Sequence, residues 1–70
     1  MQQFVVYANI SIVVPIEVSA DSAEEALERG EQIFDNMTDE EIISAGMIGA
    51  PLDGVFCVKN TEGDIILEKA

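Results

Sequence analysis

Hydrophobic residues alternate with other residues along the first part of the chain. From Phe4 to Ala20 every even-numbered position is apolar, whereas the odd-numbered positions mix apolar, polar and charged residues. A period of two residues is typical of β-strands with one buried face. The even-numbered side chains are therefore predicted to face the core.

This alternating segment is too long for one straight strand. At about 3.3 Å per residue it would extend about 50 Å, whereas a compact domain of this length has a radius of gyration of about 11 Å. We expect a turn near Asn9 to Ser11. A two-residue loop would invert the buried parity, so the loop has an odd length or the strand is bent and continuous. Pro15 lacks a backbone N–H and is expected at a sheet edge or a bulge.

After Ala20 the apolar positions change to a helical spacing of three and four residues. This pattern predicts one main amphipathic helix. Ser22 with Glu25 is a capping box, and Asp21 is an alternative cap. Gly30 lies within the apolar stripe, where glycine costs about 1 kcal/mol relative to alanine, which indicates close packing on the sheet. The stripe consists of Ala23, Ala26, Leu27, Gly30, Ile33, Phe34 and Met37.

The second half of the chain predicts a short helix and a terminal hairpin. Thr38 with Glu41 forms another capping box and Gly46 is a candidate stop, with Ile42 and Ile43 expected to face inward. "MIGAPLDG" is expected to be a loop, and "GVFCVK" and "DIILEK" flank the turn "NTEG". The element order is ββααββ, which predicts an α+β fold with a four-stranded antiparallel sheet and the main helix packed on one face. No boundary or repeat divides residues 1–70, so one domain is expected.

Charge changes the expected partners. The 70 residues include 14 acids and 3 bases, a formal net charge of −11. Such a chain repels nucleic acid and anionic membranes and attracts basic surfaces, so neither direct nucleic-acid binding nor membrane binding is expected. The N-terminal apolar run is interrupted by polar residues and lacks a basic signal-peptide start. With a single cysteine, these features favour a cytoplasmic protein.

Candidate chemistry is sparse. The chain has no histidine, the commonest general base, and its one cysteine, Cys57, lies in an apolar strand and is expected to be a core thiol. The carboxylates lie on helix faces and in turns, and none follows the calcium-loop pattern. We therefore expect no enzyme activity, no catalytic residues, no metal site and no cofactor.

The main helix carries a row of acids. Glu24, Glu28, Glu31 and Asp35 are separated by four, three and four residues, so they share one helix face, and Asp39, Glu40 and Glu41 continue the acidic sequence. Like charges at these spacings destabilise a helix by a few tenths of a kcal/mol per pair. The row is either a partner-binding surface that imitates a run of phosphates or a solvated face that favours solubility.

The other candidate surface is the sheet, because residues 1–16 carry no charged side chain. If the outer face of the sheet is bare, the odd-numbered residues Val5, Tyr7 and Val13 are exposed on it. Covered by another chain, they would form a homodimer or a partner-binding face. The alternative is a hydrated sheet with a few scattered apolar residues.

The join between strand and helix resembles a known group. "IEVSADSAEEALERG" follows a V-x-V-x-A-x-S-x-E-E-A pattern at Ile16, Val18, Ala20, Ser22, Glu24, Glu25 and Ala26. Over residues 4–34 the chain resembles the DpnD/PcfM-like small proteins associated with restriction loci, plasmids and phages. The resemblance implies a mobile-element setting and carries no catalytic residue.

Two hypotheses follow. The first is a small acidic, non-enzymatic interaction protein that binds a basic protein surface, in the manner of an anti-CRISPR or other anti-defence inhibitor that imitates nucleic acid. The second is a homodimeric regulatory or binding module that acts through its sheet face or edge. In the second, the acidic helix serves only solubility.

Overall fold

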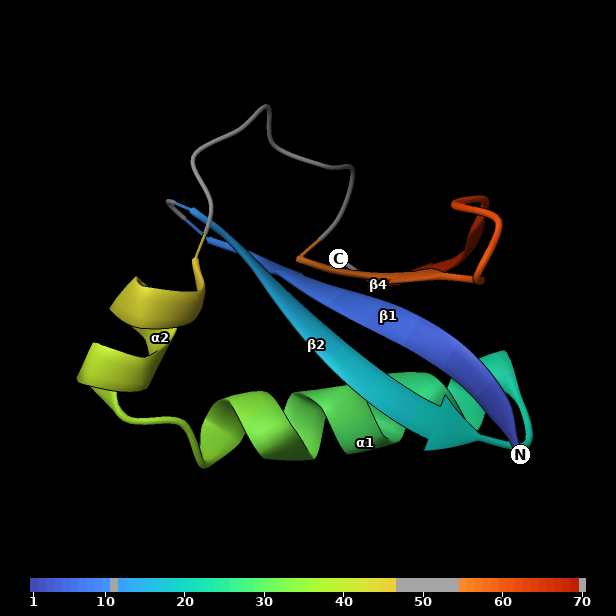
Figure 1. Ribbon diagram of the computed structural model, residues 1–70, viewed down its shortest axis with the longest axis horizontal. Helices are drawn as coiled ribbons and strands as arrows, with labels where there is room; N and C mark the ends of the chain where they lie inside the picture. Colours follow the sequence, from blue (N-terminus) through green and yellow to red (C-terminus); the bar gives the residue numbers. More distant parts are fainter. Residues whose placement is uncertain (11, 47–54, 70) are drawn as a thin grey trace.

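The computed structural model describes residues 1–10, 12–46 and 55–69 (Figure 1). Two strands, two helices and two further strands follow one another in the predicted ββααββ order, which confirms the α+β class. They are β1 (Gln2–Asn9), β2 (Val13–Ala20), α1 (Ala23–Asp35), α2 (Asp39–Ala45), β3 (Phe56–Lys59) and β4 (Ile65–Lys69). The predicted loop at residues 47–54 lies outside the described residues.

The strands form one antiparallel sheet in the order β2-β1-β3-β4. Helix α1 runs along one face of this sheet, below β1 and β2 in Figure 1, and α2 follows it toward the tip of the β1–β2 hairpin. The two edges are therefore β2 and β4. The edge position of β2 agrees with the prediction for Pro15. Within the described ranges, no helix is long and apolar enough to cross a lipid bilayer.

The β1–β2 hairpin keeps its parity. Phe4 pairs with Val18 and Val6 with Ile16, and three residues separate the strands, as the odd-length loop predicts. The even-numbered strand residues are buried: Phe4, Val6, Ala8, Val14, Ile16, Val18 and Ala20. The expectation that Ile10 joins them is wrong. Ile10 is 47% exposed because it follows the end of β1, where the strand alternation stops.

Ser22 is the N-cap of α1, as expected, and its side chain accepts a hydrogen bond from the Glu25 N–H at 3.2 Å. The predicted capping box is only half formed, because the structure shows no return bond from the Glu25 carboxylate to the Ser22 N–H. The carboxylate of Glu25 forms an ion pair with Arg29, one turn along the helix. Gly30 is buried against Val6, and a Cβ at this position would lie 2.6 Å from Val6 Cγ1. The prediction that this glycine permits close packing on the sheet is confirmed.

Helix α2 has the complete predicted capping box. The Thr38 N–H donates to Glu41 Oε1 at 3.0 Å, and the Glu41 N–H donates to Thr38 Oγ1 at 3.2 Å. Ile42 packs against the core, but Ile43 is 73% exposed, so the prediction for Ile43 is wrong. Adjacent helical residues point about 100° apart, so this single short helix presents only one of the two to the sheet.

Gly46 is the C-cap of α2, as predicted. Its φ of −68° does not require glycine. Space favours glycine only weakly, because a Cβ here would meet the flexible side-chain end of Ile12 and lie 3.0 Å from the backbone oxygen of Ile42.

The β3–β4 hairpin completes the sheet. The side-chain carbonyl of Asn60 accepts hydrogen bonds from the N–H groups of Glu62 and Asp64, both at 3.0 Å, and holds the turn. Val58 pairs with Leu67 but Lys59 pairs with Ile65, so β4 contains one extra residue at this point. Such a bulge disrupts the local pairing and bends the strand.

Candidate functional site

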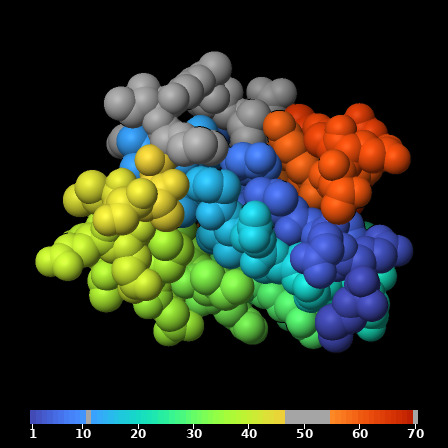
Figure 2. Space-filling model, viewed as in Figure 1, coloured from blue at the N-terminus to red at the C-terminus, as the bar shows by residue number. Residues whose placement is uncertain are grey.

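The acidic row follows one flank of α1. Glu24, Glu28 and Asp35 are exposed, whereas Glu31 is half-buried. The row lies on the flank nearer β4, because Glu31 reaches Lys69 at the end of that strand. On the opposite flank, Arg29 reaches β2. Figure 2 shows that α1 and α2 adjoin at the surface.

Glu31 differs from the rest of the row because it has a cationic partner. Lys69 Nζ lies 3.1 Å from Glu31 Oε1 and 3.0 Å from Oε2. The two side chains are 27% exposed for Glu31 and 54% exposed for Lys69. Glu31 therefore connects α1 to β4, and its charge is largely compensated.

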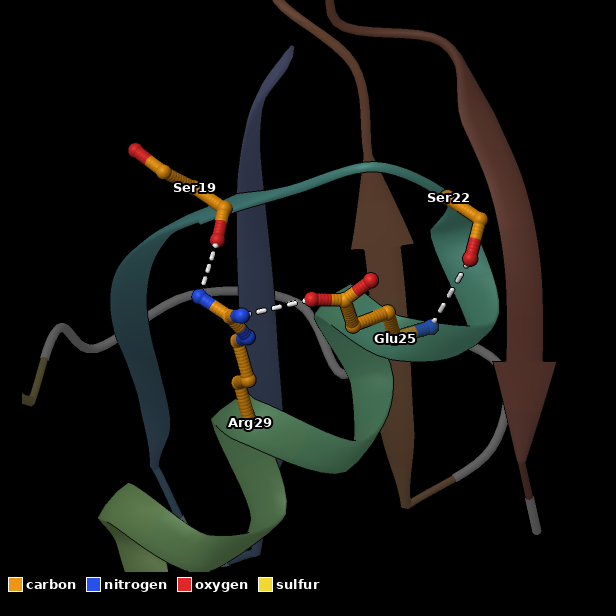
Figure 3. Close-up of polar contacts among 4 residues, drawn as sticks. All are labelled: Ser19, Ser22, Glu25 and Arg29. Atoms are coloured by element: carbon orange, nitrogen blue, oxygen red, sulfur yellow. Dashed lines mark hydrogen bonds and ion pairs between the residues drawn. The ribbon is translucent and has the colours of Figure 1, made fainter. Parts of the chain in front are cut away.

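Arg29 is the second engaged cation. Its Nη2 lies 2.6 Å from Glu25 Oε1, and its Nη1 donates to the backbone carbonyl of Ser19 at 2.8 Å (Figure 3). Both side chains of the ion pair are partly exposed, so the pair contributes at most about 1 kcal/mol. The guanidinium also ties α1 to the outer edge of β2.

Lys59 is the third. Its ammonium lies 5.0 Å from the centroid of the Tyr7 ring, within cation–π range. Arg29, Lys59 and Lys69 are the three basic residues of the sequence. Each basic side chain therefore contacts another group of the same molecule. The surplus of carboxylates remains without compensation.

Helix α2 extends the acidic surface by two residues. Asp39 and Glu40 are exposed in its first turn, where the helix dipole stabilises negative charge. Glu41 is exposed as well, but its carboxylate accepts a hydrogen bond from the Thr38 N–H and so caps the helix. The predicted acidic residues thus divide into two kinds. Exposed and unpaired among the described residues are Glu24, Glu28, Asp35, Asp39 and Glu40; structurally engaged are Glu31 and Glu41.

The proposed self-association face differs from the expectation of a bare outer sheet. Val13 is only 8% exposed, and Val5 and Tyr7 are half-buried. Cys57, which pairs with Tyr7 and shares its face, is fully buried. The assumption that nothing covers the outer face is wrong at Val13, so this residue cannot meet another chain as it stands.

Two shallow cavities accompany the sheet. One of about 260 Å³ is lined by Gln3, Phe4, Val5, Glu17 and Thr61. The other, of about 390 Å³, lies between β2 and α1 and is lined by Glu17, Val18, Ser19, Arg29, Gln32 and Ile33. Each contains a single carboxylate, so neither has the pair of carboxyl groups with separated pKa values that acid–base chemistry would need. Among the described residues, no group of three acids or thiols lies close enough together to hold a metal ion.

The sequence interpretation missed one surface. Ile65 and Ile66 are 45% and 42% exposed on the edge strand β4. A signal was present, since two adjacent isoleucines break the period-two pattern of a half-buried strand, as the bulge at this point does in the structure.

No family model, curated protein or solved structure matches this chain. The likeness of residues 4–34 to the DpnD/PcfM-like group stays a prediction.

Proposed function

We propose that this chain is a small acidic interaction protein, without enzyme activity, that binds a basic protein surface through α1 and α2. One observation supports this most strongly. All three cations are engaged within the molecule, while five carboxylates on the two helices are exposed and unpaired among the described residues. Any approaching basic surface meets negative charge that no internal group neutralises.

The spacing of the charges limits the kind of recognition. From Glu24 to Asp35 the row extends about 16 Å along the helix, with the Cβ atoms of neighbouring acids about 5–6 Å apart. Duplex DNA carries one charge per about 1.7 Å. The row is therefore sparser than a run of phosphates, and overall complementarity with a basic surface supports binding better than phosphate-by-phosphate imitation.

A basic surface of this kind commonly exists to bind nucleic acid. The narrower proposal is that the partner is a nucleic-acid-binding protein, such as a defence complex, and that the acidic helices block its groove. The mobile-element setting implied by the resemblance of residues 4–34 supports this form. It predicts that partner and nucleic acid compete, with nucleic acid displaced as this chain is added.

Capture from extracts of the source cell tests the proposal. We expect a partner to be retained at about 50 mM salt and released at about 200 mM, because counterions screen the contacts. Glu28→Lys is expected to lower the affinity of the captured partner about tenfold. Glu17→Lys is the matched control, since it makes the same change of charge at an exposed position on β2.

Two results would contradict the proposal. Binding that is insensitive to salt would show that charge is not the basis of recognition. Equal losses from Glu28→Lys and Glu17→Lys would show that net charge, and not the surface of α1 and α2, controls the affinity.

The second candidate function acts through the sheet. The structure leaves the outer face a weaker candidate, because Val13 is buried and Val5 and Tyr7 are half-buried. The edge of β4 is a stronger one, because its isoleucines are exposed. Sedimentation at several concentrations tests the homodimer: a monomer at every concentration would remove it.

A further inference from the structure

The two edges of the sheet are not equivalent, and the edge at β2 is blocked at two of its outward backbone groups. The N–H of Asn9 donates to Val55 O at 2.6 Å, so the odd-numbered backbone groups of β1 point toward β3 and away from β2. By the alternation of an antiparallel ladder, the odd-numbered groups of β2 then point outward. Pro15 has no N–H to offer there, and the Ser19 carbonyl is bound by Arg29 (Figure 3).

The same alternation describes the other edge. Tyr7 and Cys57 exchange their backbone bonds across β1 and β3, so the groups of Phe56 and Val58 point toward β4. Val58 pairs with Leu67, which directs the backbone groups of Glu68 away from the sheet. Ile66 is the extra residue of the bulge, which the regular ladder with β3 leaves unpaired. Among the described residues, no other strand pairs with this side of β4.

The side chains around this open edge are apolar and acidic. Ile65 and Ile66 are exposed, and the carboxylates of Glu62, Asp64 and Glu68 are exposed nearby in the turn and the strand. The cations in the same hairpin are occupied, since Lys69 contacts Glu31 and Lys59 lies over Tyr7. An extended chain arriving at β4 would meet backbone groups, apolar surface and negative charge together.

We propose that the open edge of β4 accepts an extended segment of the partner, with alternating apolar and basic side chains, as a fifth strand of the sheet. This inference rests on the proposed function, because it gives the same basic partner a second contact, at the edge of β4, in addition to α1 and α2. Strand addition obtains affinity from main-chain hydrogen bonds and specificity from alternate side chains. Charge complementarity selects a basic segment over a second copy of this chain, since two copies would bring together two molecules of net charge −11.

A titration of the full chain with defined peptides tests the docking mode. The probe is a synthetic peptide of alternating valine and lysine, about as long as β4. Its binding is followed by amide NMR of the isotope-labelled protein. We expect shifts and about tenfold slower hydrogen exchange at Ile66 and Glu68. Two control peptides are expected to produce neither the chemical-shift changes nor the slower exchange. One has glutamate in place of lysine, and the other has an N-methylated backbone.

Matched variants separate the edge from general electrostatics. Ile66→Lys is expected to lower the affinity for the valine–lysine peptide about tenfold. Ile33→Lys makes the same change at a side chain of nearly equal exposure, 44% against 42%, on the flank of α1 away from β4, and is expected to change the affinity less than about twofold. Should Ile66→Lys fail to fold, Glu68→Pro removes the outward N–H as Pro15 does in β2, with Glu17→Gln as the charge control.

The outcomes are distinguishable. Peptide-induced shifts confined to α1 and α2, or equal effects of Ile66→Lys and Ile33→Lys, would overturn the strand addition and leave the acidic surface as the docking site. Absence of peptide binding at low salt would also overturn it. The proposed function is judged separately, by the capture experiment and its Glu28→Lys and Glu17→Lys variants.

Discussion

The backbone of Gly30 lies so close to the side chain of Val6 that a Cβ would come within 2.6–2.7 Å of all three branching carbons of the valine. Real Cβ atoms are essentially never found that close to another heavy atom. The helix therefore sits on the sheet at a distance that only glycine permits at this position. The close approach buries Ala26 and Val6 completely and positions both flanks of α1.

Gly30→Ala is expected to lower the free energy of unfolding by about 1–3 kcal/mol, because overpacking outweighs the gain of about 1 kcal/mol in helix propensity. Gly46→Ala is the control. Its Cβ would meet the flexible end of Ile12, which can rotate away, so a loss below about 1 kcal/mol is expected. Urea denaturation measures both. A stabilised Gly30→Ala protein would show that α1 can move off the sheet freely.

Opening the edge of β2 is expected to cause self-association. Pro15→Val restores an outward N–H, and Arg29→Met releases the Ser19 carbonyl, so the double variant presents an unprotected edge. We expect its sedimentation coefficient to rise with concentration at about 0.15 M salt, where charge repulsion is screened. Lys59→Met removes the same charge without opening the edge and serves as the control. A double variant that behaves like this control would mean that β2 is protected by another feature.

The bond between Lys69 and Glu31 is expected to contribute little to stability. Its side chains are 54% and 27% exposed, and partly exposed ion pairs contribute less than about 1 kcal/mol. A double-mutant cycle with Lys69→Met and Glu31→Gln measures the coupling directly. A coupling energy above about 2 kcal/mol would contradict this and would show that the attachment of β4 depends on this contact.

Salt is expected to stabilise the fold. Raising the ionic strength from about 0.01 M to 0.15 M shortens the Debye length from about 30 Å to about 8 Å and screens the repulsion along α1. A gain of about 1 kcal/mol would raise the Tm by about 4–8 °C for a domain of this size. The Glu28→Lys, Asp35→Lys double variant, with its formal charge changed from −11 by +4 to −7, is expected to gain less. Calorimetry at both salt concentrations makes the comparison, and an equal gain would exclude the helical charges as the cause.

Much of the fold could be predicted from the sequence because local signals agreed with one another. The parity of the strand residues, the caps at Ser22 and Thr38 and the close approach at Gly30 each specify short-range geometry, and the structure confirms them. The helical stripe is confirmed only in part, because Ile33, which was expected to face the core, is 44% exposed. The prediction for Ile43 was wrong because the periodicity of a seven-residue helix does not determine which of two adjacent residues faces the core. Ile10 failed because the alternation was continued past the end of its strand.

The candidate site was less predictable, since it depends on contacts between distant residues. The row on α1 was visible in the sequence, but the pairing of Glu31 with Lys69 joins residues 38 positions apart. Helical spacing likewise indicated Arg29 as a partner of Glu25, but not its bond to Ser19 on the edge of β2. The order of the strands, which makes β4 an open edge, follows from long-range pairing that no local pattern contains.

The connection between β1 and β2 has a consequence for how related sequences can vary. Three residues separate Asn9 from Val13, and this odd number keeps the even-numbered side chains of both strands on the face of α1. Deleting or inserting one residue within the connection would leave the pairs of β1 and β2 intact, because hairpin loops of two and of four residues are also common, but it would move the apolar positions of β2 from even to odd numbers. Homologues are therefore expected to vary in the length of the connection, with the apolar positions of β2 shifting in parity accordingly, but to keep an apolar residue where Ile12 packs against the core.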